Sequence, residues 1–520
     1  MSKTTMTILL SADIPAGDGT ASADDDAPFV ILDKSGRVFA PTDFGAPLGR
    51  GEAGVGTADD DLAADGRALL ISGREQAWNG AQWDCEKFRG NEIEVIGSFR
   101  SANPAVKVSV QFTVNGYTSY NNIFTVITND GAYSGGNGKF RIPANAEQIY
   151  VYIESDNLRD IYADDFRISV SGRYKYCPVP EQIRFADTSS YPSLKEIYKD
   201  DFIFGTCISR TLTETPEYSK LMLAQFGSVT CENSMKPESL LDMDRCLSDP
   251  ARYNESPAVD LANARAELDF AQKHGLKVRA HTLVWHSQTP DRLFYENYDI
   301  RGKLADRSLM LKRMENYIRT VMQLMDEKYP GLVYAWDVVN EAADDAGGMR
   351  KSLWYQTIGD DYIAHAFAFA RRYAPKGAKL VYNDYNCYIP SKQEDMLEFL
   401  RPAAQAGNID GVGMQSHLKT DVSLDTYFDC LKRFNAELGV EIQVTELDIG
   451  CSGSTPEEQG EYYREYFRRL LEVKKDVPVT SVTVWGLSDG MTWRTSEQPL
   501  LFNADLSRKP AFDGTVKAKN

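Results

Sequence analysis

The stretch VYAWDVVNE, residues Val333–Glu341, is an apolar and partly β-branched run that ends in a carboxylate. A second such run, EIQVTELDI at Glu441–Ile449, carries Glu446 close to its end. Both runs are typical of parallel strands that are buried on both faces. An ionised carboxylate is costly to bury unless it is paired or hydrogen-bonded, so Glu341 and Glu446 indicate a functional pair.

Six further apolar runs, each followed by a longer amphipathic stretch, accompany these two. The intervening segments, such as Ser308–Lys328 and Gln459–Lys474, have helical periodicity. Eight strand-then-helix units within residues 193–515 predict an α/β fold, a (β/α)8 TIM barrel. An open doubly wound sheet is the alternative, but it would not need eight units. The further runs are Phe202–Ser209, Ser228–Asn233, Lys277–His286, Lys379–Asn386, Gly411–Leu418 and Ser481–Asp489.

Polar residues gather at the C-terminal ends of these runs, and in such a barrel that end is the active-site face. The chain has 5 histidines, and three of them, His281, His286 and His417, lie at these ends. A single one of them would be as well explained as a satisfied core histidine, but three beside two glutamates favour a site. The full set is Glu232, Asn233, His281, His286, Asn340, Glu341, Asp384, Asn386, Gln415, His417, Glu446, Asp448, Trp485 and Asp489.

The N-terminal third of the chain has a different pattern. Within residues 46–171 apolar and polar residues alternate, as in Val106–Val114, and helix signals are almost absent. This alternation predicts a β-sandwich of jelly-roll-like architecture that precedes the barrel. Residues 1–45 form an acidic leader with one expected strand at Phe29–Leu32, and residues 172–192 are expected to connect the two domains.

Composition narrows the classes of function. The 520-residue chain has a net charge of −18 and a pI of about 4.9, which disfavours polyanionic partners such as nucleic acid and acidic membranes. The same charge is compatible with a neutral polysaccharide. No segment is long and apolar enough to span a bilayer, and no obligatory protein partner is indicated. The 8 cysteines are scattered and lack the spacing of a zinc site, so we expect no metal in the active site.

The N-terminal sequence MSKTTMTILLSADIPAG has only a short apolar stretch and makes a poor signal peptide. A cleaved or truncated N-terminus is one explanation, and a cytoplasmic enzyme is another. For an enzyme that acts on a polysaccharide, we expect an extracellular or cell-envelope location.

The two glutamates would face each other across the mouth of the barrel. A pair of carboxyl groups is the working part of most glycosidases, and a separation of about 5–5.5 Å gives double displacement with retention. One carboxylate attacks the anomeric carbon, while the other protonates the leaving oxygen and then deprotonates water. The nucleophile must be ionised, and His417 on the neighbouring run could donate a hydrogen bond to Glu446. Asn340 would reach the 2-hydroxyl group of the reacting sugar.

These strings resemble glycoside hydrolase family 10, the retaining endo-β-1,4-xylanases, in the family's order and throughout residues 193–515. The matching strings are Glu232–Pro237, His281–Gln288, Trp336–Glu341, Asn383–Asn386, Gly411–His417, Thr445–Asp448 and Trp485–Asp489 with Trp493. One departure is visible after Ser287–Pro290, where many relatives carry a Trp and this chain has Asp291–Phe294.

The resemblance implies that Glu341 is the acid/base and Glu446 the nucleophile in the hydrolysis of xylan and xylo-oligosaccharides, without a catalytic cofactor. It implies glycone contacts from Glu232, Asn233, Lys236, His281, Trp285 and Gln288. Asn340, Gln415, His417 and Trp485 would line the subsite of the reacting sugar, with Trp493 also among the substrate-binding residues, and Tyr385 would lie on the leaving-group side.

Two alternatives to a xylanase are considered, namely a glycosidase with another substrate and a protein that binds polysaccharide without cleaving it. A related barrel glycosidase acting on β-glucan or mixed linkages would need room for a hydroxymethyl group, and Lys236 and Glu232 near the C5 position leave little. A non-catalytic polysaccharide-binding protein would be expected to have lost Glu341 or Glu446, yet both are present.

The sandwich resembles a family 22 carbohydrate-binding module in the strings Ile71–Gly80, Tyr150–Glu154 and Tyr162–Phe166. On an extended strand Tyr150, Tyr152 and Glu154 share one face, which we expect to be exposed and to suit the apolar face and hydroxyl rim of a sugar. Ordinary sheet packing is the alternative explanation. We expect these three residues and Trp78 to bind sugar. Such modules often hold a structural calcium ion, for which Asp164 or Asp165 are candidate ligands.

Overall fold

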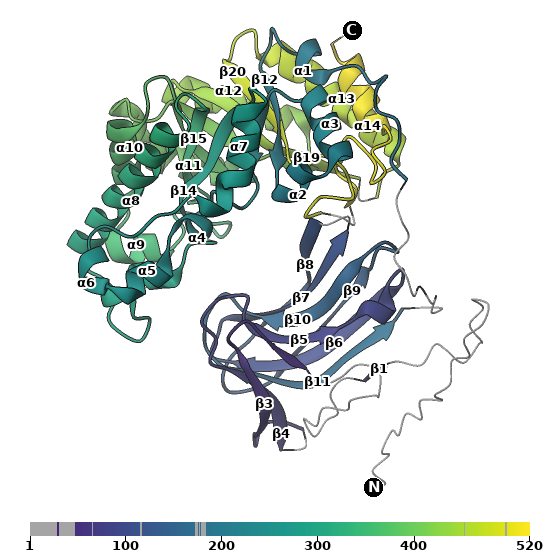
Figure 1. Cartoon of the computed structure of the whole chain (residues 1–520), viewed down its shortest axis with the longest axis vertical. Coiled ribbons are helices and arrows are strands. Elements are labelled where there is room, and N and C mark those ends of the chain that lie inside the picture. Colours follow the sequence, from purple (N-terminus) through teal and green to yellow (C-terminus); the bar gives the residue numbers. More distant parts are fainter. Residues whose placement is uncertain are drawn as a thin grey trace. The chain divides into compact units, whose positions relative to one another are not determined.

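The structure is a computed structural model, and it describes residues 29–30, 47–64, 66–114, 117–171, 175, 177, 184–451, 453–494 and 497–519. The chain divides into two compact units, Met1–Arg184 and Phe185–Asn520 (Figure 1). Apart from Phe29–Val30, the leader expected at residues 1–45 lies outside the described residues, as does part of the expected connector at 172–192. The domain limits drawn from the sequence remain predictions.

The first unit is a sandwich of two antiparallel sheets, which confirms the predicted fold class for this region. One sheet has the order β3-β4-β11-β6-β9, with β1 paired to β11: Gly54–Asp59, Arg67–Ser72, Ile161–Val170, Glu92–Ser101, Ser134–Arg141 and Phe29–Val30 for β1. The other has the order β2-β5-β10-β7-β8: Leu48–Arg50, Gly80–Asp84, Glu147–Glu154, Ala105–Val114 and Tyr117–Ile127.

Alternation of side chains along the strands builds the core of the sandwich. In β10, Ile149, Val151 and Ile153 belong to the buried cluster, so the intervening Tyr150, Tyr152 and Glu154 lie on the opposite face of their sheet. Within the core, Trp83 of one sheet stacks on Phe166 of the other with ring centroids 4.6 Å apart.

The second unit is a closed barrel of eight parallel strands, as predicted. Each strand pairs with its neighbours, and β17 pairs with β19 and β20 with β12 to close the ring. A short strand, β18 (His417–Lys419), adds to the end of β19. The barrel strands are β12 (Ile203–Ile208), β13 (Ser228–Cys231), β14 (Lys277–Trp285), β15 (Val333–Asn340), β16 (Lys379–Asp384), β17 (Gly411–Met414), β19 (Glu441–Gly450) and β20 (Val479–Val484).

Helices follow the strands and cover the barrel, because each presents an apolar stripe to the sheet. In α13 (Pro456–Val473) the buried Tyr463, Tyr466, Phe467 and Leu470 recur at helical spacing, and a capping box between Thr455 and Glu458 starts the helix. The other helices are α1 (Leu194–Ile197), α2 (Arg210–Glu214), α3 (Pro216–Gln225), α4 (Pro237–Leu240), α5 (Met243–Ser248), α6 (Pro250–Tyr253), α7 (Arg265–Lys273), α8 (Arg307–Lys328), α9 (Leu353–Ile358), α10 (Tyr362–Tyr373), α11 (Pro390–Gln405), α12 (Leu424–Leu438) and α14 (Pro510–Lys517).

Short 3-10 turns complete the described elements, at Glu86–Phe88, Ala262–Ala264, Asp291–Phe294 and Glu296–Tyr298. Among the residues that the structure describes, no helix has the length and apolar character needed to cross a bilayer.

Candidate active site

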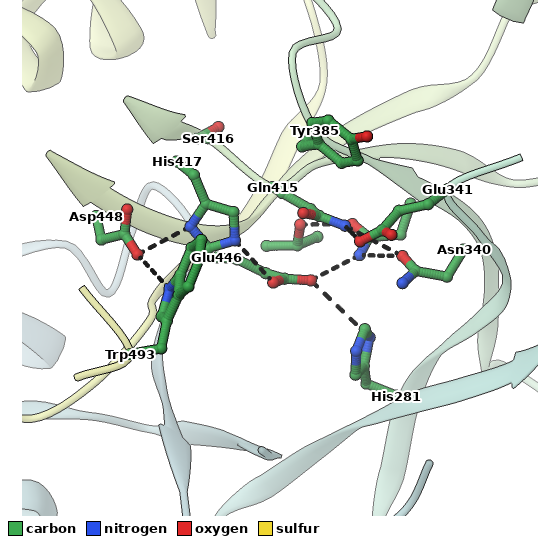
Figure 2. Close-up of polar contacts among 12 residues, drawn as sticks. His281, Asn340, Glu341, Tyr385, Gln415, Ser416, His417, Glu446, Asp448 and Trp493 are labelled. Carbon is green, nitrogen blue, oxygen red and sulfur yellow. Dashed lines mark hydrogen bonds and ion pairs between the residues drawn. The ribbon is translucent and has the colours of Figure 1, made fainter. Parts of the chain in front are cut away.

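The two glutamates singled out in the sequence come from the carboxyl ends of barrel strands. Glu341 directly follows β15, and Glu446 lies in the second half of β19. In a parallel barrel these ends open on the same rim, and Figure 2 shows both carboxylates directed toward one shared region.

Glu446 is held in one position by hydrogen bonds to both of its carboxylate oxygens. Oε1 accepts a hydrogen bond of 2.8 Å from Nδ2 of Asn383, and Oε2 lies 3.1 Å from Nε2 of His417 (Figure 2). His281 Nδ1 is 3.9 Å from Oε1. Glu446 is only 5% exposed, so its charge depends on these neighbours rather than on water.

His417 lies between two carboxylates. Its Nδ1 is 2.8 Å from Oδ2 of Asp448, and its Nε2 faces Glu446. Burial lowers the pKa of His417, but Asp448 and Glu446 outweigh that effect and raise the pKa to about 10. The ring is therefore an imidazolium near neutral pH, and each ring nitrogen donates a hydrogen bond to a carboxylate.

The same contacts determine the charge state of Glu446. Burial acts to raise its pKa, but the hydrogen bond from His417, the electrostatic influence of the neighbouring His281 and His417, and the bond from Asn383 together lower the pKa below its ordinary value. Glu446 is thus ionised and fixed in orientation, which is what a nucleophile requires.

Glu341 has a different environment. Its Oε2 accepts a 2.8 Å hydrogen bond from Nε1 of Trp285, and its Oε1 accepts a 2.8 Å bond from Nε2 of Gln415. The residue is partly exposed and has a positive φ of 54°. Arg350 donates from Nε to the carbonyl oxygen of Glu341 at 3.2 Å and holds this left-handed turn. The hydrogen bonds to the Glu341 carboxyl thus come from an indole and an amide, whereas Glu446 is bonded to a histidine.

Side-chain amides connect the two glutamates. Asn383, which bonds Glu446, lies 3.0 Å from the side-chain amide of Asn340. Gln415, which bonds Glu341, lies 3.2 Å from the same amide. One continuous polar network therefore sets the relative positions of both carboxyl groups (Figure 2).

Residues predicted to contact the glycone form a second group. Nζ of Lys236 donates to Oδ1 of Asn233 and to Oε1 of Gln288, each at 2.8 Å, and lies 5.0 Å from the centre of the Trp285 ring. Burial lowers the pKa of Lys236, while the charge of Glu232 acts to raise it. The predicted residues Glu232, Asn233, Lys236, Trp285 and Gln288 are thus brought together.

The aromatic residues predicted for the site, Trp485 and Trp493, lie against the two histidines beside Glu446. The Trp485 ring meets His281 edge-on at 5.7 Å, and the Trp493 ring meets His417 edge-on at 5.0 Å. Trp493 also donates from Nε1 to Oδ2 of Asp448 at 3.1 Å, yet it is 45% exposed. A large exposed aromatic surface beside the charged centre suits stacking on a sugar ring.

Tyr385 belongs to a cluster beyond Glu341. Its hydroxyl donates to Oδ2 of Asp345 at 2.6 Å and accepts from Arg350 Nη2 at 3.2 Å, while Lys392 Nζ lies 3.5 Å from its ring centre. Because Arg350 also bonds the carbonyl of Glu341, Tyr385 is tied to the same turn.

Two residues in contact with this site, Asn383 and Arg350, were not singled out in the sequence, and Asp448 was placed at the active-site end without a role. Asn383 is a polar residue at a strand end inside a quoted string, so that signal could have found it. Arg350 lies in the loop between β15 and α9, and only the folded chain brings it to Glu341.

In the sandwich, the predicted sugar-binding residues surround Arg50, which the sequence did not single out. Its guanidinium carbon lies 4.0 Å from the ring centre of Tyr152 and 5.9 Å from those of Trp78 and Tyr120. The exposed face expected for Tyr152 is wrong, since this residue is only 3% exposed, and Arg50 covers its ring. Trp78 and Tyr120, exposed by 41% and 57%, provide the open aromatic surface instead.

Polar groups border this aromatic surface. Arg50 donates from Nη1 to Gln82 at 2.9 Å and from Nη2 to Gln111 at 2.7 Å. Glu154 accepts a 2.6 Å bond from Ser109, and its burial raises the pKa of its carboxyl. Tyr150, on the same face of β10, is partly exposed.

Comparison with known proteins is consistent with this geometry. Residues 193–518 match the family model described as "Glycosyl hydrolase family 10". The chain is 41% identical over 340 residues to endo-1,4-beta-xylanase B of Butyrivibrio fibrisolvens, covering 63% of this chain and 53% of that protein. It is 33% identical over 507 residues to endo-1,4-beta-xylanase A of Thermotoga maritima, covering 92% and 46%. The chain thus spans about half the length of these curated relatives.

Among solved structures, the chain is similar to the CBM22-1–GH10 modules of Clostridium thermocellum endo-1,4-beta-D-xylanase 10B, complexed with xylohexaose. The TM-score is 0.60 at 28% identity, and the match covers 94% of this chain and 96% of that one. The match includes both the sandwich and the barrel, so the likeness of the sandwich to a family 22 module is confirmed.

Proposed function

This chain belongs to glycosyl hydrolase family 10, and on that premise we propose that it is a retaining endo-β-1,4-xylanase that cleaves internal bonds of xylan. The unequal environment of the two glutamates is the observation that best supports this function. Glu446 faces the imidazolium of His417, whereas the donors to the Glu341 carboxyl oxygens among the described residues are a neutral indole and a neutral amide. Glu446 is thus kept ionised, as a nucleophile requires, and Glu341 takes the acid/base role in this proposal.

In the first step, the Glu446 carboxylate attacks the anomeric carbon, and the bond from that carbon to the leaving oxygen breaks. Glu341 transfers its proton to that oxygen, so the leaving chain departs as a neutral alcohol. The Glu341 carboxylate that results is stabilised by its bonds from Trp285 and Gln415.

In the second step, Glu341 removes a proton from water, and the resulting oxygen attacks the glycosyl-enzyme ester. Glu446 is released as a carboxylate, again hydrogen-bonded to His417 and Asn383. Two inversions at the same carbon give net retention of configuration. No step requires a metal or an organic cofactor.

Substrate class follows from the glycone side. Lys236, Asn233 and Gln288 form a rigid hydrogen-bonded group next to Trp285. We expect this group to read the hydroxyls of a xylose residue and to leave little room for the extra hydroxymethyl group of glucose. The related proteins named above are xylanases, which supports the same choice.

Release of reducing ends from xylan and from carboxymethylcellulose tests the proposal. We expect rapid release from xylan and at most a few per cent of that rate from carboxymethylcellulose. Comparable rates on both polymers would point to a broader β-glucanase, and no release from either would point to a binding protein.

For the sandwich we propose xylan binding at the surface formed by Arg50, Trp78, Tyr120, Tyr150 and Glu154. Exposed aromatic rings beside amide and carboxylate groups match the apolar face and hydroxyl rim of a sugar. Tyr152 would support this surface from beneath Arg50 rather than contact sugar.

We propose that the sandwich holds a structural calcium ion, with Asp164 or Asp165 as the candidate ligands. Asp164 accepts backbone bonds from Ala64 at 3.1 Å and from Asp165 at 2.8 Å. In the described part of the chain, no three His, Cys, Asp or Glu side chains gather in a metal-binding group. An unchanged melting temperature after chelator treatment would refute the proposal, and a decrease reversed by calcium would support it.

We also propose an extracellular or cell-envelope location, since polymeric xylan does not enter cells. Immunoblotting of culture supernatant, envelope and cytoplasmic fractions tests this, and protein confined to the cytoplasm would contradict it.

A further inference from the structure

Ser416 has a backbone conformation that is unusual for its residue type. Its φ is 65°, in the left-handed region, and it is 5% exposed. It stands between Gln415, which bonds Glu341, and His417, which bonds Glu446. The direction in which the chain leaves Ser416 therefore sets where both partners of the catalytic pair lie (Figure 2).

The strand pairing changes register at this point. Met414 pairs with Val444, an offset of 30 residues, whereas His417 pairs with Asp448, an offset of 31. The extra residue belongs to β19, since this strand also gains one residue against β20 between Val444 and Leu447, and the left-handed Ser416 lies opposite this bulge.

A chain of buried hydroxyl groups holds Ser416 from outside the barrel. Its Oγ donates to the carbonyl oxygen of Met414 at 3.0 Å, so it must accept the 2.7 Å bond from the hydroxyl of Tyr427. The Tyr427 hydroxyl in turn accepts a 2.8 Å bond from Tyr466. Tyr427 and Tyr466 are fully buried and come from α12 and α13.

We infer that Tyr427 and Tyr466 act as positioning residues that fix Ser416 and, through it, the contacts of Gln415 with Glu341 and of His417 with Glu446. This inference rests on the proposed function, and it adds that the covering helices α12 and α13 help determine the geometry of the catalytic pair. Neither tyrosine would touch substrate.

The pH dependence of activity distinguishes a positioning role of Tyr427 and Tyr466 from a role in stability alone. His417 keeps the pKa of Glu446 low, and among the described residues His281, Lys236 and Cys207 are further ionisable groups that act on this carboxylate. If His417 moves away from Glu446, the pKa of Glu446 rises, and the acidic limb of the activity profile shifts to higher pH.

The test compares Tyr427→Phe with Tyr198→Phe in the full chain. Tyr198 is equally buried, and its hydroxyl donates a 2.6 Å bond to the carbonyl of Thr515, far along the chain from the site. Each variant loses one buried hydroxyl group, so we expect similar decreases in melting temperature.

On xylo-oligosaccharides we expect Tyr427→Phe to lower kcat about 5- to 20-fold and to move the acidic limb upward, with KM changed less than about 2-fold. Tyr198→Phe should keep kcat and the acidic limb of the wild type. We further expect Ser416→Ala to reproduce the effect of Tyr427→Phe, and the double variant to be no worse than either single one, because both break the same bond.

Equal kcat values and equal acidic limbs for Tyr427→Phe and Tyr198→Phe would overturn the inference. So would additive losses in the double variant. Because the wild-type enzyme is measured on xylan in the same experiment, an inactive wild type would instead contradict the proposed function.

Discussion

Nε2 of His417 lies 3.1 Å from Oε2 of Glu446, and the second ring nitrogen of the same histidine is bonded to Asp448. A histidine bound between two carboxylates cannot readily lose its proton, and its pKa is raised to about 10. It therefore supplies a permanent positive charge to a buried glutamate throughout the neutral range. In the proposed function this relationship makes Glu446 the nucleophile, because it is the glutamate that His417 keeps ionised.

Replacement of Asp448 by Asn should weaken the hold of His417 on Glu446, although Asp448 does not itself bond Glu446. Without the second carboxylate, the pKa of His417 falls and the pKa of Glu446 rises. We expect activity at pH 6 to fall about 10- to 100-fold and the acidic limb to move to higher pH. Initial rates on xylan between pH 4 and pH 9 measure both effects. An unchanged acidic limb would show that His417 does not control the charge of Glu446.

Stability should depend on pH through the same histidine. The pKa of His417 is raised on folding, so its contribution is fully present below about pH 6.5, its unfolded value, and is lost as pH rises through about 10. We expect His417→Gln to reduce the decrease in melting temperature over that alkaline interval. Thermal unfolding of both proteins at matched ionic strength tests this, and parallel curves would contradict it.

Removal of the acid/base should depend on the leaving group. We expect Glu341→Ala to lower turnover of xylan by about 1000-fold or more, but to affect an aryl xylobioside with an acidic phenol much less, because such a leaving group needs no proton. Steady-state rates on the two substrates measure the difference. Equal losses on both would remove Glu341 from the acid/base role.

The order of anomers in the product reports on the mechanism. We expect proton NMR during early hydrolysis to show the β-anomer first, since double displacement retains configuration. The α-anomer appearing first would require a single displacement by water.

Binding by the sandwich should depend on its exposed aromatic surface. In a full chain carrying Glu446→Ala to prevent hydrolysis, we expect Trp78→Ala or Arg50→Ala to weaken binding to insoluble xylan at least about 10-fold. Ile127→Ala is the matched control, because it removes an apolar side chain that is 76% exposed from the same strand as Tyr120. Equal retention of all the variants on xylan would show that this surface does not bind the polymer.

The barrel could be predicted because each of its strands is a short apolar run that is recognisable from adjacent residues alone. The runs Lys277–His286, Val333–Glu341 and Glu441–Ile449 differ from the observed strands by one residue at an end. The candidate pair Glu341 and Glu446 could be singled out in the same way, since a carboxylate at the end of a buried apolar run is unusual in itself. Both signals depend only on residues adjacent in the sequence.

Other features of the site could not be predicted because they depend on distant contacts. The left-handed turn at Ser416 lies opposite a bulge in β19, and its support comes from helices that follow it in sequence. Tyr152 was expected to be exposed from its place on β10, but Arg50 from another strand covers its ring. Alternation gives the face of a sheet, and it does not say what lies over that face.

In the proposed mechanism Glu446 forms a covalent bond to the sugar, and trapping this glycosyl-enzyme intermediate tests that bond most directly. A 2-deoxy-2-fluoro xylobioside with a good leaving group should form the glycosyl-enzyme quickly and hydrolyse it slowly, because fluorine destabilises both oxocarbenium-like transition states while the leaving group speeds only the first step. Digestion and mass spectrometry should then place one monofluorinated disaccharide on the peptide that contains Glu446. A label on Glu341, or an active enzyme that never becomes labelled, would show that Glu446 is not the nucleophile.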